Sequence, residues 1–315
     1  MTVIEVQKLN KRYGEHAVLQ DVTFTVQRGE IFGLIGQNGA GKTTLVESIA
    51  GLRRPDSGAI RVLGIDPQND RGPQKDRGPL RKRLGIQLQA SQLPDKIKVW
   101  EALDWFSAFY ERPVAWEEIL AALGLEEKRN DSFEQLSGGQ KQRLSIALAL
   151  VGRPDILILD ELTTGLDPEA RRSIWQYIEQ VRERGVTILL VSHFMEEAER
   201  LCDRLAVLQN GRIVALDTPA GIVAKVGGEQ RVRFRPSVPL AESLLAELPE
   251  VQRVTRHGET ITVAGTGNLL QAVASTLARS QIIAHELRVE QATLDDAFIT
   301  LTGAKSTSGS NGGAV

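Results

Sequence analysis

Cysteine is almost absent from this chain of 315 residues, which contains only Cys202. A single cysteine cannot form an intramolecular disulfide, so a fold held together by internal disulfides is excluded. The hydrophobic content of 42% is sufficient for ordinary packed cores. The cysteine content fits a protein in a reducing compartment.

Long hydrophobic runs are also missing. The apolar segments at residues 156–159 and 187–191 have the length of strands. They are far shorter than the roughly 20 residues that a membrane-spanning helix needs. Residues 1–5 have no basic start, which argues against a secretory signal. We therefore expect a cytoplasmic protein, which would need another chain to cross a bilayer if it serves a membrane process.

The third absence is an excess of positive charge. The formal net charge is -2, with 25% charged residues. Proteins that bind nucleic acid usually carry a basic field, so no nucleic-acid partner is expected. The length is comfortable for two domains.

Glycine, in contrast, is concentrated in one informative segment. Residues 36–43 match G-x-x-x-x-G-K-[S/T], with a strand-like run at residues 31–35 before them and a helical pattern after them. Glycines allow backbone N–H groups to turn inward around a phosphate, and the following helix adds its N-terminal dipole. The predicted nucleotide-binding residues of this loop are Gly36, Gln37, Asn38, Gly39, Ala40, Gly41, Lys42, Thr43 and Thr44.

Two apolar runs end in side chains that suit phosphate chemistry. Residues 156–159 lead into Asp160 and Glu161, and residues 186–191 lead towards His193. Continuous apolar runs are typical of buried parallel strands, whose carboxyl ends gather ligands at one edge of the sheet. We therefore expect these side chains to lie near the phosphate-binding loop.

A third motif, Leu-Ser-Gly-Gly-Gln, lies between them at residues 136–140. The order of the three motifs resembles the ATP-binding subunit of an ABC transporter, and the resemblance covers roughly residues 3–218. It implies a P-loop α/β ATPase with an antiparallel β-subdomain and a helical signature subdomain. One departure is Leu162, where the family usually has proline, and we interpret it as tolerated variation.

The resemblance implies how ATP and Mg²⁺ are handled. Thr43 and Asp160 are expected to hold Mg²⁺, and Glu161 is expected to act as the general base for the attacking water. His193 stands where the family carries a switch histidine that contacts the γ-phosphate. These residues give the chain the expected activity of an ATP hydrolase coupled to transport.

Two further residues take roles from the same resemblance. Gln89 fits the glutamine that senses Mg²⁺ and the attacking water, although Gln87 lies close enough to be an alternative. Tyr13 resembles the aromatic residue that stacks on adenine. Stacking tolerates different bases, so this residue alone does not distinguish ATP from GTP.

The signature motif implies a partner. In the family, this motif binds the γ-phosphate of the partner's ATP, and an aspartate corresponding to Asp167 crosses the interface. We therefore expect a homodimer or pseudo-dimer that packs head to tail around two ATP molecules and drives a separate multi-helix membrane permease. The chain would then be peripheral on the cytoplasmic face of the cell membrane. The signature residues are Ser137, Gly138, Gly139 and Gln140.

Aromatic residues gather in the segment between the loop and the signature. Six of the chain's fifteen lie within residues 100–116. They form either the core of a small helical subdomain or a groove for a short helix of a membrane partner, and one cluster can serve both purposes. The six are Trp100, Trp105, Phe106, Phe109, Tyr110 and Trp116.

The C-terminal third reads as a separate unit with alternating strands and helices. Its order, with helices at residues 240–248 and 269–279, suggests a small α+β ferredoxin-like sandwich. Thr293 and the acidic pair Asp295 and Asp296 predict the start of a last helix rather than a catalytic carboxylate pair. The expected organisation is an ATP-binding domain at 1–218 with a helical subdomain at about 90–150, a linker at 219–229, an accessory domain at 230–303 and a disordered tail at 304–315.

The ending at residues 292–303 resembles that of ATPases from daunorubicin-resistance-type exporters, the type-two ABC group. The resemblance therefore implies the ATP-hydrolysing subunit of an efflux transporter. The rival is a soluble ABC ATPase that acts on ribosomes or DNA without a membrane partner. Such proteins usually carry a second ATPase domain or a long coiled coil, and this sequence has neither a second signature nor extended heptads. An inactive module of the same fold is a third alternative, against which the complete set of catalytic residues argues.

Overall fold

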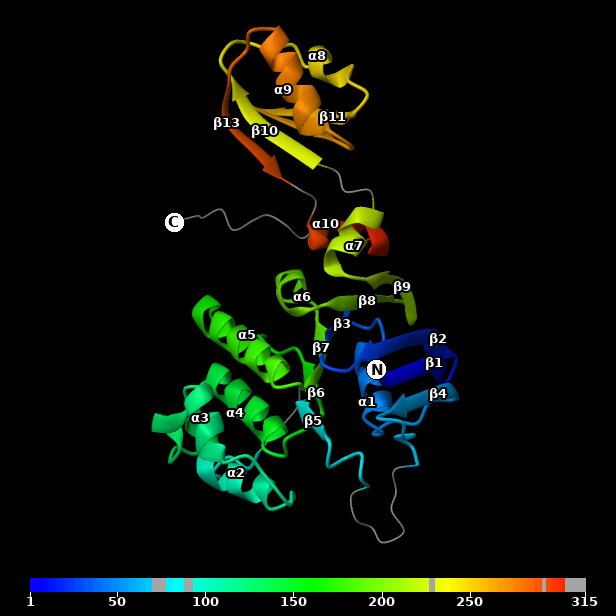
Figure 1. The fold of residues 1–315 in the computed structure, drawn as a ribbon, viewed down its shortest axis with the longest axis vertical. Coiled ribbons are helices and arrows are strands. Elements are labelled where there is room, and N and C mark those ends of the chain that lie inside the picture. The colour runs from blue at the N-terminus through cyan, green and yellow to red at the C-terminus, as the bar shows by residue number, and fades with distance from the viewer. Residues whose placement is uncertain (70–77, 88–92, 227–229, 291–292, 304–315) are drawn as a thin grey trace. The chain divides into compact units, whose positions relative to one another are not determined.

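The computed structural model describes residues 1–69, 78–87, 93–226, 230–290 and 293–303. It divides the chain into two compact units, Met1–Pro219 and Ala220–Val315 (Figure 1). The first unit contains two sheets and the second unit one, and each unit has its own apolar core.

A six-stranded sheet forms the centre of the first unit. Its order is β5-β6-β7-β3-β8-β9, in which the first five strands are parallel and β9 pairs antiparallel with β8. Strands β3, β6 and β7 are buried throughout, as expected of continuous apolar runs covered on both faces. The strands are β3 (Ile31–Gly36), β5 (Leu84–Gln87), β6 (Ile156–Asp160), β7 (Thr187–Ser192), β8 (Arg204–Gln209) and β9 (Arg212–Asp217).

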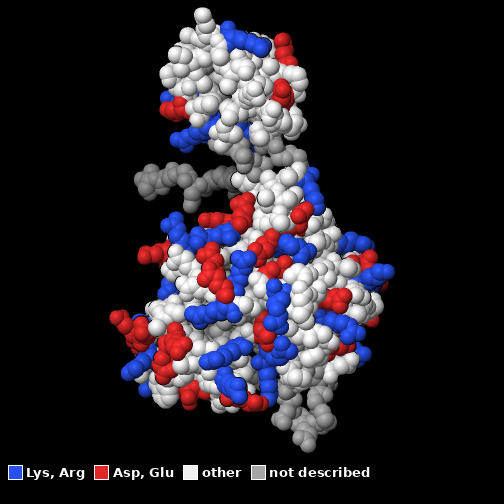
Figure 2. All heavy atoms as spheres, viewed as in Figure 1, with Lys and Arg blue, Asp and Glu red and all other residues white. Residues whose placement is uncertain are grey.

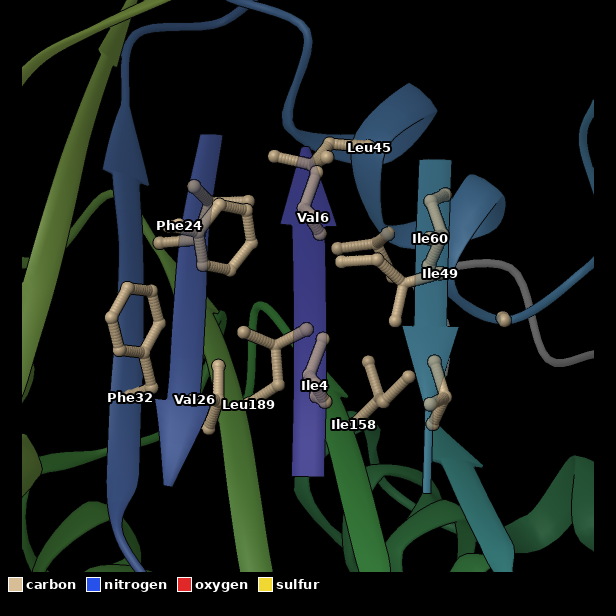
Figure 3. Packing of buried hydrophobic residues seen from close by; sticks show 14 of the residues in the cluster. Ile4, Val6, Phe24, Val26, Phe32, Leu45, Ile49, Ile60, Ile158 and Leu189 are labelled. Carbon is tan, nitrogen blue, oxygen red and sulfur yellow. The ribbon is translucent and has the colours of Figure 1, made fainter. Parts of the chain in front are cut away.

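A second, antiparallel sheet packs against this one. It has the order β2-β1-β4, with strands β1 (Thr2–Tyr13), β2 (His16–Gln27) and β4 (Ser57–Val62). Figure 3 shows how Ile4 and Val26 of this sheet meet Leu189 of the central sheet, with apolar residues of helix α1 (Lys42–Ile49) nearby. Phe24 and Phe32 stack across the two sheets, with ring centroids 5.2 Å apart. This shared core fixes the phosphate-binding loop between β3 and α1.

Helices complete the first unit. Two of them, α5 (Pro168–Glu183) and α6 (Met195–Leu201), follow β6 and β7 along the chain. The helical subdomain consists of α2 (Val99–Ser107), α3 (Trp116–Ala122), the short 3₁₀ turns η1 (Glu126–Lys128) and η2 (Phe133–Gln135), and α4 (Gly138–Leu150).

The second unit has an antiparallel four-stranded sheet of order β11-β12-β10-β13. Its core combines strand residues such as Val232 and Phe234 with Leu269, Val273 and Leu277 of one helix. These three leucine and valine positions recur every four residues and so share one helix face. The elements are α7 (Pro219–Lys225), β10 (Gln230–Pro236), α8 (Ser243–Ala246), β11 (Val251–His257), β12 (Thr260–Gly265), α9 (Leu269–Arg279), β13 (Ala284–Glu290) and α10 (Leu294–Thr302).

Two local predictions need correction. The linker at 219–229 contains helix α7, because proline suits a first helical turn and Ile222 is fully buried. The helix expected at 240–248 is limited to the single turn of α8. The helix start at Thr293 is confirmed: its Oγ1 accepts from the N–H of Asp296, and its own N–H donates to the Asp296 carboxylate. The tail at 304–315 lies outside the described residues.

Candidate functional site

The loop between β3 and α1 is shaped by glycine. Gly39 and Gly41 have φ values of 82° and 105°, a backbone region that favours glycine and lets N–H groups converge. A Cβ atom on Gly36 would lie 2.4 Å from the carbonyl oxygen of Leu208, so a side chain there would collide with backbone. The glycine pattern of the motif thus follows from the path of the loop.

Lys42 begins α1 and lies over the loop. Its Nζ donates hydrogen bonds to the carbonyl oxygens of Gly36 at 2.7 Å and Gln37 at 2.9 Å. Burial lowers the pKa of Lys42, while the nearby carboxylates of Glu161 and Asp160 act in the opposite direction. The ammonium group therefore lies between two carbonyl oxygens and two carboxylates, at the edge of the sheet where the sequence predicts phosphate binding.

Asp160 ends β6 in a buried position, with 4% of its surface exposed. Burial, and then the charge of Glu161, raise the pKa of Asp160 to about 6. Its backbone N–H donates to Oε1 of Gln87, which is almost fully buried at the end of β5. Gln87 therefore joins two neighbouring strands, while Gln89 lies outside the described residues.

Glu161 is the next residue, and it has φ +52°, an unusual backbone conformation for glutamate. Such strained positions are frequent at functional sites. The Glu161 Oε1 atom lies 3.3 Å from Nδ1 of His193, which follows β7. The structure thus brings together two side chains that the sequence placed at the ends of neighbouring strands.

A cavity of about 510 Å³ is lined by Lys42, Asp160 and Glu161, whereas His193 is not part of its lining. It reaches from the end of β1 across the loop to the carboxylates at the end of β6. Tyr13 lies at its rim with 43% of its surface exposed, and the charged groups of Arg53 and Lys11 lie 5.4 and 5.6 Å from its ring centre. The cavity is lined by Tyr13, His16, Val18, Asn38, Gly39, Gly41, Lys42, Thr43, Thr44, Asp160 and Glu161.

The donor set of this cavity fits a hard divalent cation. Among the described residues, no group of three or more histidine, cysteine or acidic side chains forms a metal cage of its own. Mg²⁺ is commonly bound by one or two protein ligands together with substrate phosphates. Thr43 and Asp160 both line the cavity, and a cation would offset the repulsion between Asp160 and Glu161.

The signature residues do not line this cavity. Ser137 caps α4: its Oγ accepts from the N–H of Gln140 at 3.3 Å, and the Gln140 side chain accepts from the Ser137 N–H at 2.9 Å. Ser137 and Gly138 are exposed. Gly139 lies near Leu166, because a Cβ built on Gly139 would be 3.0 Å from a Leu166 methyl group. The start of α4 is therefore an accessible helix N-terminus.

Asp167 caps α5. Its Oδ1 accepts hydrogen bonds from the N–H groups of Glu169 at 3.1 Å and Ala170 at 2.9 Å. The hydrogen bond from Ala170 is the main reason that the pKa of Asp167 is lowered. Asp167 therefore caps the N-terminus of α5, a role that was not predicted from the sequence.

Three residues of the site were missed from the sequence. His16 lines the cavity opposite Tyr13 in the β1–β2 hairpin, where pairing across the turn was the available signal. Gln142 of α4 donates to the carbonyl oxygens of Leu162 at 3.0 Å and Glu161 at 3.4 Å. Glu197 of α6 accepts from Thr163 at 2.9 Å. No sequence motif indicated the last two contacts.

A second cavity, of about 530 Å³, lies between the helical subdomain and the central sheet. Phe106, Tyr110 and Phe133 line one part of it, and Leu84 and Ile86 line another. The aromatic cluster has an inner part and an outer part. Tyr110 packs against Gly152, as expected of a subdomain core, whereas Trp105 is 53% exposed, as expected of a groove for a partner helix. Among the described helices, none is long and apolar enough to cross a membrane.

Fold and site together define a P-loop ATPase with a helical signature subdomain. The family described as "ABC transporter" matches residues 19–164. The chain is 38% identical over 312 residues to a Nod factor export ATP-binding protein I of Ralstonia nicotianae, covering 96% of this chain and 94% of the relative.

Solved structures agree with this assignment. An ATP-binding subunit of an ABC transporter superposes with a TM-score of 0.64 at 33% identity, covering 71% of this chain and 93% of that one. An ATP-binding cassette solved as a post-hydrolysis dimer with ADP and phosphate gives a TM-score of 0.61 at 25% identity, covering 68% and 98%. The chain belongs to the ABC transporter ATP-binding subunits. Members of this family are ATP-binding ATPases coupled to transport.

Proposed function

We propose that this chain hydrolyses ATP as a head-to-tail dimer in which the signature motif of one copy completes the nucleotide site of the other. The separation between the cavity and the start of α4 carries this proposal. The cavity collects Lys42, Asp160 and Glu161, whereas Ser137 and Gly138 are exposed outside its lining. The N-terminus of α4 offers a helix dipole to an anion, which suits the γ-phosphate of ATP bound to a partner copy.

Within one site, each residue has a separate role in the transfer of the γ-phosphoryl group to water. Lys42 pairs with the β- and γ-phosphates, and Tyr13 stacks on the adenine at the cavity rim. Thr43 and Asp160 hold Mg²⁺, which neutralises phosphate charge when bound. Gln89 is proposed to report the state of this site to the helical subdomain. The low exposure of Asp160 strengthens its attraction to a cation.

Glu161 is proposed as the general base. Its backbone N–H donates to Val191 at 2.9 Å, and its carboxylate lies beside His193, so both ends of the residue are positioned. A carboxylate is a weak base, and the positioning of water therefore contributes as much as proton affinity. His193 would orient this carboxylate and contact the γ-phosphate.

The transport partner is proposed to be a separate multi-helix permease. Phe106 lines the 530 Å³ cavity, and its ring centre lies 6.0 Å from that of the exposed Trp105 and 6.4 Å from that of the exposed Phe109. These side chains offer an aromatic groove for a short permease helix. The chain would then lie peripherally on the cytoplasmic face of the membrane. The relatives are named for the export of Nod factor. For this chain we propose outward transport, with the cargo selected by the permease.

The second unit supports a finer assignment. Its order β10-α8-β11-β12-α9-β13, with a sheet order of β11-β12-β10-β13, supports the proposal that it is a ferredoxin-like sandwich. Together with the capped final helix α10, it favours the daunorubicin-resistance-type group of exporter ATPases. The soluble ABC ATPase acting on ribosomes or DNA is the less favoured alternative.

The test is an affinity purification from detergent-solubilised native membranes with ATP and Mg²⁺. The bait is the Glu161→Gln variant, which should retain bound nucleotide because only the base is changed. The matched control adds Trp105→Ser and Phe109→Ser, which leave the nucleotide site intact. We expect the first bait to recover a stoichiometric multi-helix membrane protein and the second to lose it. Recovery of ribosomal or DNA-associated proteins by both baits would contradict the proposal.

A further inference from the structure

The sheet of the second unit has one open face that is rich in arginine. Strand β10 alternates arginine with apolar residues: Val232 and Phe234 are buried in the core, and Arg231, Arg233 and Arg235 lie between and beside them. Successive side chains of a strand point to opposite faces of the sheet. The three arginines therefore share the face opposite the core that α9 covers.

Neighbouring strands add to this face. Arg233 is paired in register with Arg288 of β13, and Arg253 of β11 is paired with Ala264, which is itself paired with Arg231. Arg233, Arg253 and Arg288 are all exposed. In Figure 2, blue side chains gather on the side of this unit on which β10 and β13 lie in Figure 1. We name this surface the arginine face: Arg231, Arg233, Arg235, Arg253 and Arg288.

The charge of the arginine face is only partly compensated. Arg231 lies 3.8 Å from Asp296, and Arg235 lies 3.7 Å from Glu286. Arg231 is also paired in register with Glu290 of β13. In the described parts of the chain, Arg233, Arg253 and Arg288 have no carboxylate within ion-pair distance.

The pairing of Arg233 with Arg288 on neighbouring strands destabilises the sheet when no anion is bound. Like charges directly opposite one another on neighbouring strands destabilise a sheet, and Arg233 and Arg288 are such a pair. An anionic partner between them would convert repulsion into attraction. A second copy of the same face would instead repel it, so symmetric pairing of two arginine faces is not the solution.

We propose that the arginine face binds an extended acidic peptide segment of a partner protein. Side chains two residues apart are about 6.7 Å apart in any strand, so carboxylates on alternate residues of an extended peptide match the row along β10. The planar guanidinium fork matches the geometry of carboxylates as well as that of phosphates. This inference concerns the second unit alone and does not rest on the proposed ATPase cycle.

Other polyanions fit the face less well. No tyrosine, phenylalanine or tryptophan lies on the outward positions of β10 to β13, so the stacking that supports single-stranded nucleic acid is missing. Asp296 and Glu286 lie at the two ends of the β10 row. These two carboxylates would repel the continuous negative charge of a membrane surface. A short acidic peptide that lies along the row between them would be repelled less.

The experiment measures binding of a fluorescent peptide of alternating glutamate and serine to the full-length protein by anisotropy. The variant Arg233→Glu/Arg288→Glu reverses the centre of the face. Arg279→Glu, an exposed position at the end of α9, is the matched control. A far-UV circular dichroism spectrum and urea-unfolding transitions equal to those of the wild type show that each full-length variant is folded, because the second unit has a core of its own.

We expect the wild type and Arg279→Glu to bind the peptide and the double variant to bind it roughly tenfold or more weakly, with an affinity that falls as salt rises. Equal binding by the double variant and the wild type would overturn the proposal. Tighter, face-dependent binding of single-stranded DNA or of vesicles containing phosphatidylserine would also overturn it, by assigning the face to nucleic acid or membrane.

Discussion

The hydroxyl group of Thr163 donates a 2.9 Å hydrogen bond to Oε1 of Glu197. Both side chains are fully buried, and the indole N–H of Trp175 donates to the same oxygen at 3.2 Å. Thr163 lies in the turn between Glu161 and Asp167, while Glu197 belongs to the helix that follows His193. One buried carboxylate therefore links the turn after Glu161 to the helix after His193.

Glu197→Ala should destabilise the first unit by about 2–6 kcal/mol, because it leaves the buried donors of Thr163 and Trp175 unsatisfied, at about 1–3 kcal/mol each. Glu197→Gln keeps an acceptor for Thr163 and Trp175 and should cost much less. Urea unfolding of the two variants measures the difference. Equal destabilisation by alanine and glutamine would show that the two hydrogen bonds are not the stabilising feature.

The buried Asp160 predicts an unusual dependence of stability on pH. Its pKa of about 6 in the folded chain exceeds the ordinary value of 3.8, so the folded state binds this proton more tightly than the unfolded state does. The stabilisation is complete below the unfolded pKa and is lost as pH rises through about 6. Asp160→Asn should therefore gain stability relative to wild type between about pH 4 and 7, by up to about 3 kcal/mol.

Urea unfolding across this pH range, with chelator and without nucleotide, measures the effect. Asp167→Asn provides a control of opposite sign, because hydrogen bonds from Ala170 and Glu169 lower the pKa of Asp167. Wild type should lose stability relative to that variant as pH falls. A constant difference between wild type and Asp160→Asn at every pH would contradict the assigned pKa.

Tyr13 should contribute to nucleotide affinity through its ring. We expect Tyr13→Ala to raise the KM for ATP by about 5- to 100-fold, since a stacked base contributes about 1–3 kcal/mol. Tyr13→Phe keeps the ring and should retain a KM near that of wild type. Steady-state hydrolysis with ATP and with GTP measures both variants. An unchanged KM in the alanine variant would mean that the base lies elsewhere.

Much of the site is predictable because it depends on local chemistry. The positive φ angles of Gly39 and Gly41 favour glycine, and buried parallel strands favour the apolar runs that precede Asp160 and His193. Residues in an unusual backbone conformation or at the end of a buried strand can therefore be recognised from the sequence. The ATP-binding fold is confirmed by the comparisons, and the roles of the individual side chains stay predictions.

The remainder depends on contacts between distant segments. Gln142 reaches the backbone of Leu162 only because α4 packs beside the end of β6, and Thr163 meets Glu197 across 34 positions of sequence. Neither pair follows from periodicity. The strand order β5-β6-β7-β3-β8-β9 likewise places β3 between two strands that come much later in the chain. Helix α7 could have been found from Pro219, which suits a first helical turn.

The central claim is that each nucleotide site is shared between two copies, and complementation tests it most directly. Lys42→Ala destroys the phosphate site and Ser137→Arg blocks the signature, so each variant alone should be inactive. In a mixed dimer, the intact loop of one copy meets the intact signature of the other, which restores one site. We predict that a mixture of the two, purified with a different tag on each, regains MgATP hydrolysis. Verified mixed dimers without hydrolysis would contradict the account, because a shared site must recover when its two intact halves meet.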